Sequence, residues 1–281
     1  MLVVENLSKK FQSFELKGVS FKLDKGYIMG FIGANGAGKS TTLKAMLGII
    51  YPDGGKVTVL GRDFYQNQLE LKQQIGLMLG PANYYSKSKV GLIAEVYKSF
   101  FRDWDESVYK SYLKKFNLDE NKKIAELSAG MRVKLGITFA LSHKAKLLIL
   151  DEPTSGLDPL ARDELLDVFQ EIVEDGEHSI LFSTHITSDL DKCADFIIFM
   201  RNGEILLFDT KDNIIDAYAV VKGANGQLAG ISDNLIGVKK NHYGFSGLIK
   251  KEMLPQVGNL LTERPNLEDI MVYYNKGGET K

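Results

Sequence analysis

The stretch Phe31–Thr41, FIGANGAGKST, decides the fold class of this chain. It follows the apolar run GYIMGFIG, which predicts a buried strand. It precedes KSTTLKAMLGII, which predicts a helix that continues until YPDGG breaks it. The spacing G-x-x-x-x-G-K-S is met at Gly33, Gly38, Lys39 and Ser40. A strand, a glycine loop and a helix in this order predict a loop that binds the phosphates of a nucleoside triphosphate.

Each residue type in the loop has a physical role in holding phosphate. Glycines let backbone N–H groups turn inward around the oxygens, and the helix N-terminus adds partial positive charge. We expect Lys39 to reach the β and γ phosphates and Ser40 to bind Mg²⁺. The residues expected around the phosphates are Gly33, Asn35, Gly36, Ala37, Gly38, Lys39, Ser40 and Thr41. The alternative, a chance match in a turn, becomes rare once the strand and helix are counted.

Composition and charge exclude several classes of protein. The 281 residues include 35 basic and 36 acidic side chains, so we expect no overall attraction to nucleic acid or anionic lipid. The single cysteine excludes an internal disulfide and favours a cytosolic protein, and no zinc spacing is present. The start of the sequence does not resemble a secretion signal, and the longest apolar runs are too short to span a bilayer.

The hydrophobic pattern predicts an α/β architecture. Val19, Phe21 and Leu23 alternate, which predicts strands of a half-buried sheet near the N-terminus. We expect these strands to form an antiparallel β-subdomain. Residues 86–144 contain three segments with apolar residues at helical spacing, VGLIAEVYKSFF, ESVYKSYLKKF and MRVKLGITFALSHK, which predict a helical insertion. KLLIL, ARDELLDVFQEIVED and HSILFSTH then alternate as in βαβ units with a parallel sheet.

The last part of the chain predicts a hairpin and an appendage. DFIIFMRNGEILLFD places Asn202 and Gly203 between two apolar runs, which suits a type I′ turn. After it come short strands with glycines and a short helix near NLEDIMVYY. We therefore predict a main domain over residues 1–217 and a small α+β accessory domain over residues 218–281.

A second candidate site lies at the end of a strand. In LLILDEP, Asp151 and Glu152 follow four apolar residues. At the end of such a strand an Asp could hold Mg²⁺ and a Glu could polarise the attacking water. A buried strand ending in a solvated acidic turn would have the same sequence pattern.

With these motifs in order, the chain resembles the ATP-binding subunits of ABC transporters over about Val3 to Asp209. LSAGM at 127–131 is similar to the family signature, SGLD at 155–158 to the D-loop, and STH ending at His185 to the switch histidine. Phe11 falls where the family places an aromatic ring under adenine. The resemblance implies a P-loop NTPase core of ABC type with ATP and Mg²⁺ as cofactors. It also implies Glu152 as general base, and it places His185 at the γ-phosphate.

The resemblance also implies partners. One glycine loop and one signature cannot build a complete site, so Ser128, Gly130 and Asp158 are expected at the ATP of a second copy or of a related chain. A separate integral membrane subunit would carry the cargo, with this chain peripheral on the inner face of the cell membrane and no nucleic acid bound. A chain of this length with a small appendage resembles subunits of bacterial exporters for peptides and antibiotics, although importer subunits share the core.

Two positions depart from the family pattern. Gly80 stands where the family has a glutamine that helps bind Mg²⁺; Gln73 and Gln74 come too early, and Asn83 is a weak substitute. We expect water to take that metal position. Ala129 and Met131 replace the usual Gly and Gln of the signature.

Each motif also has a simpler interpretation when taken alone. Ser128 could be only a helix N-cap, His185 a loop histidine, Phe11 a core residue and Asp158 the start of a turn. Two other functions stay open. The first is a soluble ABC ATPase acting on DNA or the ribosome, although the chain lacks the long coiled coil or second ATPase domain of those proteins. The second is an ATP-binding regulator without turnover, for which Gly80 is an argument.

Overall fold

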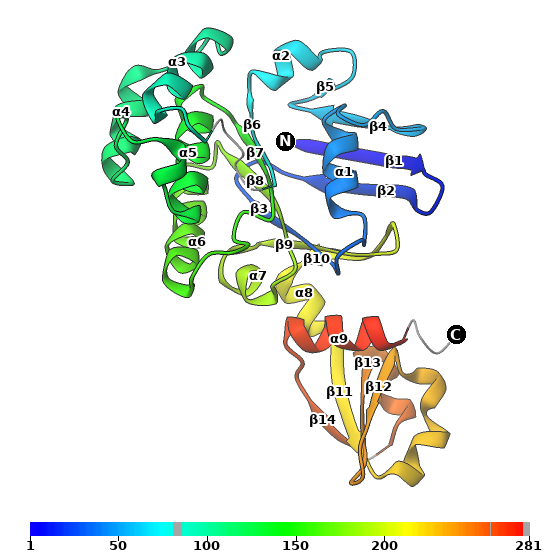
Figure 1. Cartoon of the computed structure of the whole chain (residues 1–281). Coiled ribbons are helices and arrows are strands. Elements are labelled where there is room, and N and C mark those ends of the chain that lie inside the picture. Colours follow the sequence, from blue (N-terminus) through cyan, green and yellow to red (C-terminus); the bar gives the residue numbers. More distant parts are fainter. Residues whose placement is uncertain (81–85, 259, 278–281) are drawn as a thin grey trace. The chain divides into compact units, whose positions relative to one another are not determined.

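The chain forms two compact units, Met1–Leu206 and Leu207–Lys281, called here the N-terminal unit and the C-terminal unit. The computed structural model describes residues 1–80, 86–258 and 260–277 (Figure 1). The division lies within a strand, before the domain boundary predicted at residue 217.

An antiparallel sheet opens the N-terminal unit, with strand order β2-β1-β4-β5. On β2 the side chains of Val19, Phe21 and Leu23 are buried and those between them are exposed, as the alternation predicts. The antiparallel β-subdomain is therefore confirmed. The strands are β1 (Leu2–Lys10), β2 (Glu15–Leu23), β4 (Gly54–Val59) and β5 (Arg62–Asp63).

A six-stranded sheet forms the centre of this unit, in the order β10-β9-β3-β8-β7-β6. The pairs β3/β8, β3/β9, β7/β8 and β6/β7 are parallel. Every residue of β3, β7 and β8 is buried, because both faces of a parallel sheet are covered. The strands are β3 (Ile28–Ile32), β6 (Ile75–Leu79), β7 (Leu147–Asp151), β8 (Ser179–Thr184), β9 (Phe196–Arg201) and β10 (Glu204–Thr210).

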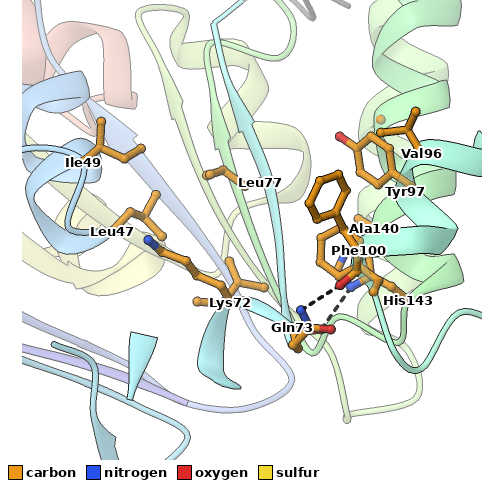
Figure 2. A pocket seen from close by; sticks show the side chains of 13 residues that line it. Leu47, Ile49, Lys72, Gln73, Leu77, Val96, Tyr97, Phe100, Ala140 and His143 are labelled. Carbon is orange, nitrogen blue, oxygen red and sulfur yellow. Dashed lines mark hydrogen bonds between the residues drawn. The ribbon is translucent and has the colours of Figure 1, made fainter. Parts of the chain in front are cut away.

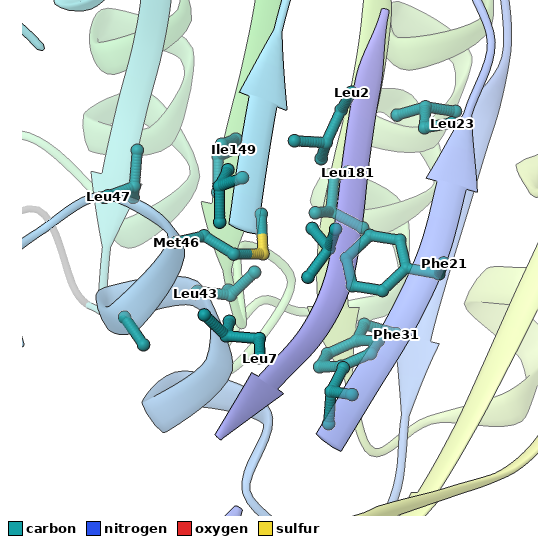
Figure 3. Close-up of a cluster of buried hydrophobic side chains, with 14 of the residues drawn as sticks. Leu2, Leu7, Phe21, Leu23, Phe31, Leu43, Met46, Leu47, Ile149 and Leu181 are labelled. Atoms are coloured by element: carbon teal, nitrogen blue, oxygen red, sulfur yellow. The ribbon is translucent and has the colours of Figure 1, made fainter. Parts of the chain in front are cut away.

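Helix α1 (Lys39–Met46) packs between the two sheets (Figure 3). Its Leu43 and Met46 share a core with Leu7 of β1 and Ile149 of β7. This core fixes the start of α1, where the glycine loop ends.

The prediction that α1 runs on to YPDGG was wrong, because the helix stops at Met46. Gly48 adopts a left-handed backbone, with φ of 64°. Its N–H donates to the Ala45 carbonyl at 3.0 Å, and the N–H of Ile49 donates to the Lys44 carbonyl at 3.0 Å. These bonds satisfy the last carbonyls of the helix and redirect the chain.

Helices cover the other face of the six-stranded sheet. The rings of Phe169 on α6 and Phe182 on β8 lie 5.5 Å apart. The helices around this sheet are α2 (Gln68–Lys72), α5 (Ala129–Ser142), α6 (Pro159–Val173) and α7 (Thr187–Cys193).

Three helices form the predicted helical segment between β6 and β7. They are α3 (Val90–Phe100), α4 (Glu106–Lys115) and α5, with a 3₁₀ turn, η1 (Ile124–Glu126), before α5. Aromatic side chains pack them together: the Tyr97 and Phe139 rings lie 4.5 Å apart, and the Tyr109 and Phe139 rings 6.1 Å apart.

The hairpin β9/β10 turns at Asn202 and Gly203, whose φ angles are 50° and 80°. Two left-handed residues are what a type I′ turn requires, so the predicted hairpin is confirmed. A Cβ on Gly203 would lie 1.8 Å from the Glu15 carbonyl oxygen, which leaves no room for any other residue. The Gly203 N–H donates to the Ala37 carbonyl at 2.9 Å, so this turn supports the glycine loop.

The C-terminal unit is a four-stranded antiparallel sheet, in the order β12-β13-β11-β14, with α9 against β12 and β13. The predicted short helix near NLEDIMVYY is α9, so the α+β appendage is confirmed. Ala219, Val221 and Ile249 belong to its own core. Its elements are α8 (Lys211–Asp216), β11 (Tyr218–Gly223), η2 (Asn225–Gly230), η3 (Ser232–Asn234), β12 (Gly237–Lys240), β13 (Phe245–Lys250), η4 (Lys251–Gln256), β14 (Leu261–Glu263) and α9 (Leu267–Gly277).

Candidate active site

The glycine loop joins β3 to α1, as the sequence predicts. Gly38 has a φ of 111°, and a Cβ there would lie 2.8 Å from the Phe14 ring, so only glycine fits. Thr42 is the first residue of the helix whose N–H donates back to the preceding turn, to the Gly38 carbonyl at 2.9 Å. The N–H groups before it belong to the open N-terminus of α1, where an anion is favoured.

Lys39 is buried, and its ammonium lies inside the loop. The Nζ donates to the Gly33 carbonyl at 2.7 Å and lies 3.3 Å from Oε1 of Glu152. The three N–H donors of the ammonium face the Gly33 and Ala34 carbonyls and the Glu152 carboxylate, and phosphate oxygens at the loop would replace one or more of these acceptors. The structure therefore places the cation where a β or γ phosphate at the loop would meet it.

Asp151 and Glu152 end β7 beside the loop. Asp151 is buried, and its Oδ1 accepts a hydrogen bond from the Ser183 hydroxyl at 2.5 Å. Glu152 has a left-handed backbone, with φ of 51°, and its Oε2 lies 2.8 Å from Nδ1 of His185. Glu152 thus stands between the ammonium of Lys39 and the imidazole of His185.

A buried carboxylate fixes the segments on either side of His185. Asp189 on α7 accepts hydrogen bonds from the hydroxyls of Thr154 at 2.7 Å and Thr184 at 2.9 Å, and it pairs with Arg162. These contacts tie the chain after β7 to the end of β8. They hold Glu152 and His185 at one end of the sheet.

Most predicted site residues of the loop and strand ends line one cleft of about 730 Å³. Those that line it are Phe11, Asn35, Gly36, Ala37, Gly38, Lys39, Ser40, Thr41, Glu152 and His185. Phe11 is 40% exposed, so it is not the core residue that the simpler interpretation expects. Gly33 and Asp151 are not among the lining residues, although the Gly33 carbonyl accepts a hydrogen bond from Lys39 and Asp151 directly precedes Glu152.

Ser128, Gly130 and Asp158 do not line this cleft. The Ser128 hydroxyl caps α5 by accepting from the Met131 N–H at 3.2 Å, and Asp158 caps α6 by accepting from the Leu160 N–H at 3.1 Å. A Cβ on Gly130 would lie 3.4 Å from Ala161 of α6, so the starts of the two helices are neighbours. That Ser128, Gly130 and Asp158 contact the ATP of a second copy stays a prediction.

The oxygen donors at the cleft suit a hard cation. Ser40 offers a hydroxyl and Asp151 a carboxylate oxygen, the ligand types that Mg²⁺ accepts while keeping several waters. Gly80 follows Leu79, the residue of β6 paired with Asp151, so the chain offers no side chain at that point to a cation that Asp151 would bind. Asn83 lies outside the described residues. Among the residues that the structure describes, no group of three His, Cys, Asp or Glu side chains could hold a metal.

A second hollow, called here the apolar groove, lies between the six-stranded sheet and the helical segment (Figure 2). It has a volume of about 490 Å³. The Gln73 side chain spans its floor, donating to the Phe100 carbonyl at 3.1 Å, so Gln73 does not reach the cleft. Its lining includes Ile49, Leu77, Val96, Tyr97, Phe100 and His143.

Sequence reasoning missed several residues of the site. Phe14 lines the cleft with its ring 6.3 Å from that of Phe11, and its place three positions later in the same loop could have indicated it. Ser183 belongs to the STH stretch, but that motif indicates a role only for His185, and Asp189 carries no motif signal. The contact of Ser183 with Asp151 is revealed only by the register of β7 against β8, which pairs the two residues.

Comparison with known proteins gives one consistent result. The family model described as "ABC transporter" matches residues 16–155. An uncharacterized ABC transporter ATP-binding protein of Bacillus subtilis (strain 168), YxlF, is 35% identical in an alignment of 215 residues that covers 73% of this chain and 69% of that protein. The lantibiotic transport ATP-binding protein SrtF of Streptococcus pyogenes is 32% identical in an alignment of 224 residues that covers 78% of this chain and 96% of SrtF.

A solved structure gives the same result. A protein whose structure is described as the ATP-binding subunit of an ABC transporter is 28% identical, with a TM-score of 0.68. The match covers 76% of this chain and 91% of the other. Within residues 1–80, 86–258 and 260–277, every helix is too short or too polar to span a bilayer.

Proposed function

This chain belongs to the ABC transporter family as an ATP-binding, ATP-hydrolysing subunit, and we propose that the cleft binds MgATP and that Glu152 activates the attacking water. The observation that supports the proposal most strongly is the position of Glu152, whose carboxylate lies 3.3 Å from Lys39 and 2.8 Å from His185 beside the glycine loop.

Nucleotide binding begins at the loop. The N–H groups of α1 and the ammonium of Lys39 hold the phosphates, and the Phe11 ring supports the base. Ser40 and Asp151 would hold Mg²⁺, which would neutralise negative charge on the phosphates when bound. Because Gly80 offers no ligand, we expect water to complete the metal shell at that point.

Hydrolysis uses the carboxylate at the end of β7. Glu152 accepts a proton from the water that attacks the γ-phosphate, and His185 orients Glu152 and steadies the phosphate. The ammonium of Lys39 offsets the negative charge on the γ-phosphoryl group as it is transferred to water.

A second copy, or a related chain, completes each site. Ser128 stands at the N-terminus of α5, a 14-residue helix whose start favours an anion, and it lies outside the chain's own cleft. We propose that Ser128, Gly130 and Asp158 face the ATP bound by the partner. Closure around two ATP molecules and opening after hydrolysis would then be the motion that drives transport.

The membrane subunit is proposed to pack on the apolar groove. Phe100 is 71% exposed and Ile49 52% exposed at its rim, and exposed apolar side chains that gather in this way mark an interaction surface. The lantibiotic transport named for SrtF supports a peptide-type cargo, and export is the direction that we propose. The chain would then act on the cytoplasmic side, where ATP is available.

The test is Glu152→Gln, which keeps the size of the side chain and removes the base. We expect the variant to bind MgATP with near wild-type affinity and to release phosphate about 10² to 10⁴-fold more slowly. Phosphate release and nucleotide binding are measured with and without candidate membrane partners, with Lys39→Ala as the control that loses binding. Rapid turnover by Glu152→Gln would remove Glu152 from this role, and a wild-type chain unable to bind MgATP would contradict the proposal as a whole.

A further inference from the structure

We propose that Ser183 is a positioning residue that orients both carboxylates of the site, Asp151 for the metal and Glu152 for the water. The inference deepens the proposed function and rests on it. Ser183 opens the STH stretch, in which the resemblance assigns a role only to His185. The role inferred for Ser183 comes from two contacts that meet at its buried hydroxyl.

The first contact is with Asp151. β7 and β8 are parallel neighbours whose register pairs Asp151 with Ser183, and both side chains are buried. The Ser183 hydroxyl donates to Oδ1 of Asp151 at 2.5 Å. A carboxylate held through one oxygen presents its other oxygen, Oδ2, in a fixed direction, and the bond limits rotation of a group that must meet Mg²⁺.

The second contact is with the backbone of Glu152. Its φ of 51° is a left-handed conformation that residues other than glycine rarely adopt. The N–H of Glu152 donates to the Ser183 oxygen at 2.9 Å, so the same hydroxyl that donates to Asp151 also accepts from the next residue. This bond stabilises the unfavourable backbone turn.

The turn at Glu152 has a consequence for catalysis. A chain that continued β7 in an extended conformation would send the Glu152 side chain elsewhere, because a strand alternates its side chains between two faces. In the turned conformation the carboxylate lies 2.8 Å from His185 and 3.3 Å from Lys39. The Ser183 hydroxyl therefore positions Glu152 by holding the Glu152 backbone, and it positions Asp151 by holding the Asp151 side chain.

A second buried serine on β8 provides a matched control. Ser179 is also completely buried, accepts from the Gly26 N–H at 3.0 Å and donates to the Asp24 carbonyl at 3.2 Å. It lies at the opposite end of the strand, away from the carboxylates. Ser179→Ala thus removes a buried hydroxyl with one donated and one accepted bond, as Ser183→Ala does, and leaves the site contacts intact.

The experiment titrates Mg²⁺ into the full chain saturated with a fluorescent, non-hydrolysable ATP analogue, and it measures analogue binding again in EDTA. We expect Ser183→Ala to raise the half-saturating Mg²⁺ concentration about tenfold, the low end of the range for partners of metal ligands. Its affinity for the analogue in EDTA should match wild type, and kcat for ATP should fall more than KM rises. Ser183→Thr, which keeps the hydroxyl, should restore the wild-type Mg²⁺ response.

The thermal midpoint of each variant separates positioning from stability. Ser179→Ala and Ser183→Ala should lose similar stability, and only Ser183→Ala should change the Mg²⁺ response. An unchanged half-saturating Mg²⁺ concentration in Ser183→Ala, or the same shift in Ser179→Ala, would overturn the inference. A wild-type chain that fails to bind the analogue would instead contradict the proposed function.

Discussion

At the scale of single residues, the molecule places its ionisable side chains in two different kinds of surroundings. Lys39, Glu152 and His185 meet at a cleft that is open to a ligand. His143 is buried in the apolar groove, stacked on Phe101 with ring centres 3.8 Å apart. Its Nδ1 lies 3.1 Å from the Gln73 carbonyl oxygen, so that nitrogen carries the proton and donates.

The stability of the N-terminal unit should depend on pH through His143. Burial lowers the pKa of His143, so the neutral form is favoured in the folded state. As pH falls below about 6.5, the unfolded chain takes up a proton before the folded chain does. The free energy of unfolding contributed by this group is therefore full above that pH and decreases below it.

Urea unfolding of wild type and His143→Phe at pH 7.5 and pH 5.5 checks this prediction. We expect wild type to lose more stability between the two pH values than the variant loses. Equal losses would show that His143 does not contribute to the pH dependence.

The sequence could predict the residues that chemistry restricts to one type. The glycines of the loop, Lys39 and Asp151 follow from the spacing and from the strand before each motif. Ser183 and Asp189 could not be predicted, because their roles arise where β7, β8 and α7 meet, and many residue types would suit a strand or helix there.

At the scale of elements, two hairpins share one turn geometry but differ in their surroundings. Leu60 and Gly61 join β4 to β5 with φ angles of 51° and 76°, and Asn202 and Gly203 join β9 to β10 with 50° and 80°. A Cβ on Gly61 would meet open space, whereas one on Gly203 would meet the Glu15 carbonyl. The first turn only connects strands, and the second also supports the glycine loop.

Gly203→Ala should therefore destabilise the N-terminal unit far more than Gly61→Ala. We expect about 1 kcal/mol for Gly61→Ala, the cost of a left-handed alanine, and at least about 3 kcal/mol for Gly203→Ala, where backbone atoms must also move. Gly203→Ala should also weaken MgATP binding, since its N–H holds Ala37. Chemical unfolding and nucleotide titration measure both effects, and similar costs for the two variants would contradict the argument.

Element type was predicted better than element ends. The three helices of the helical segment and the hairpin at Asn202 follow from periodicity and turn residues. The end of α1 could not be predicted in this way, because the apolar residues after Met46 continue the helical pattern although the helix itself ends before Gly48.

At the scale of the whole molecule, the two units have separate cores. The C-terminal unit has its own buried cluster around Val221 and Ile249, and the described residues that line the cleft all belong to the N-terminal unit. The sequence indicates the small size of the second unit through its glycine-separated strands. It cannot indicate which surface of a second copy or of a membrane protein each unit meets.

A chain ending at residue 217 should fold and bind MgATP with an affinity within about threefold of the full chain. The reason is that every residue lining the cleft, and the turn that supports the loop, precedes that point. Circular dichroism and nucleotide titration of the shortened chain check this expectation. Loss of binding with the fold intact would show that the C-terminal unit contributes to the site.

The central claim is that two chains enclose ATP between the loop of one and the Ser128 region of the other. The most direct measurement is the sedimentation of Glu152→Gln with ATP and Mg²⁺, with ADP and Mg²⁺, and with no nucleotide. The account predicts dimers carrying two ATP molecules only in the first condition, and their loss when Ser128→Arg is added. A variant that binds ATP fully and sediments as a monomer in every condition would contradict it.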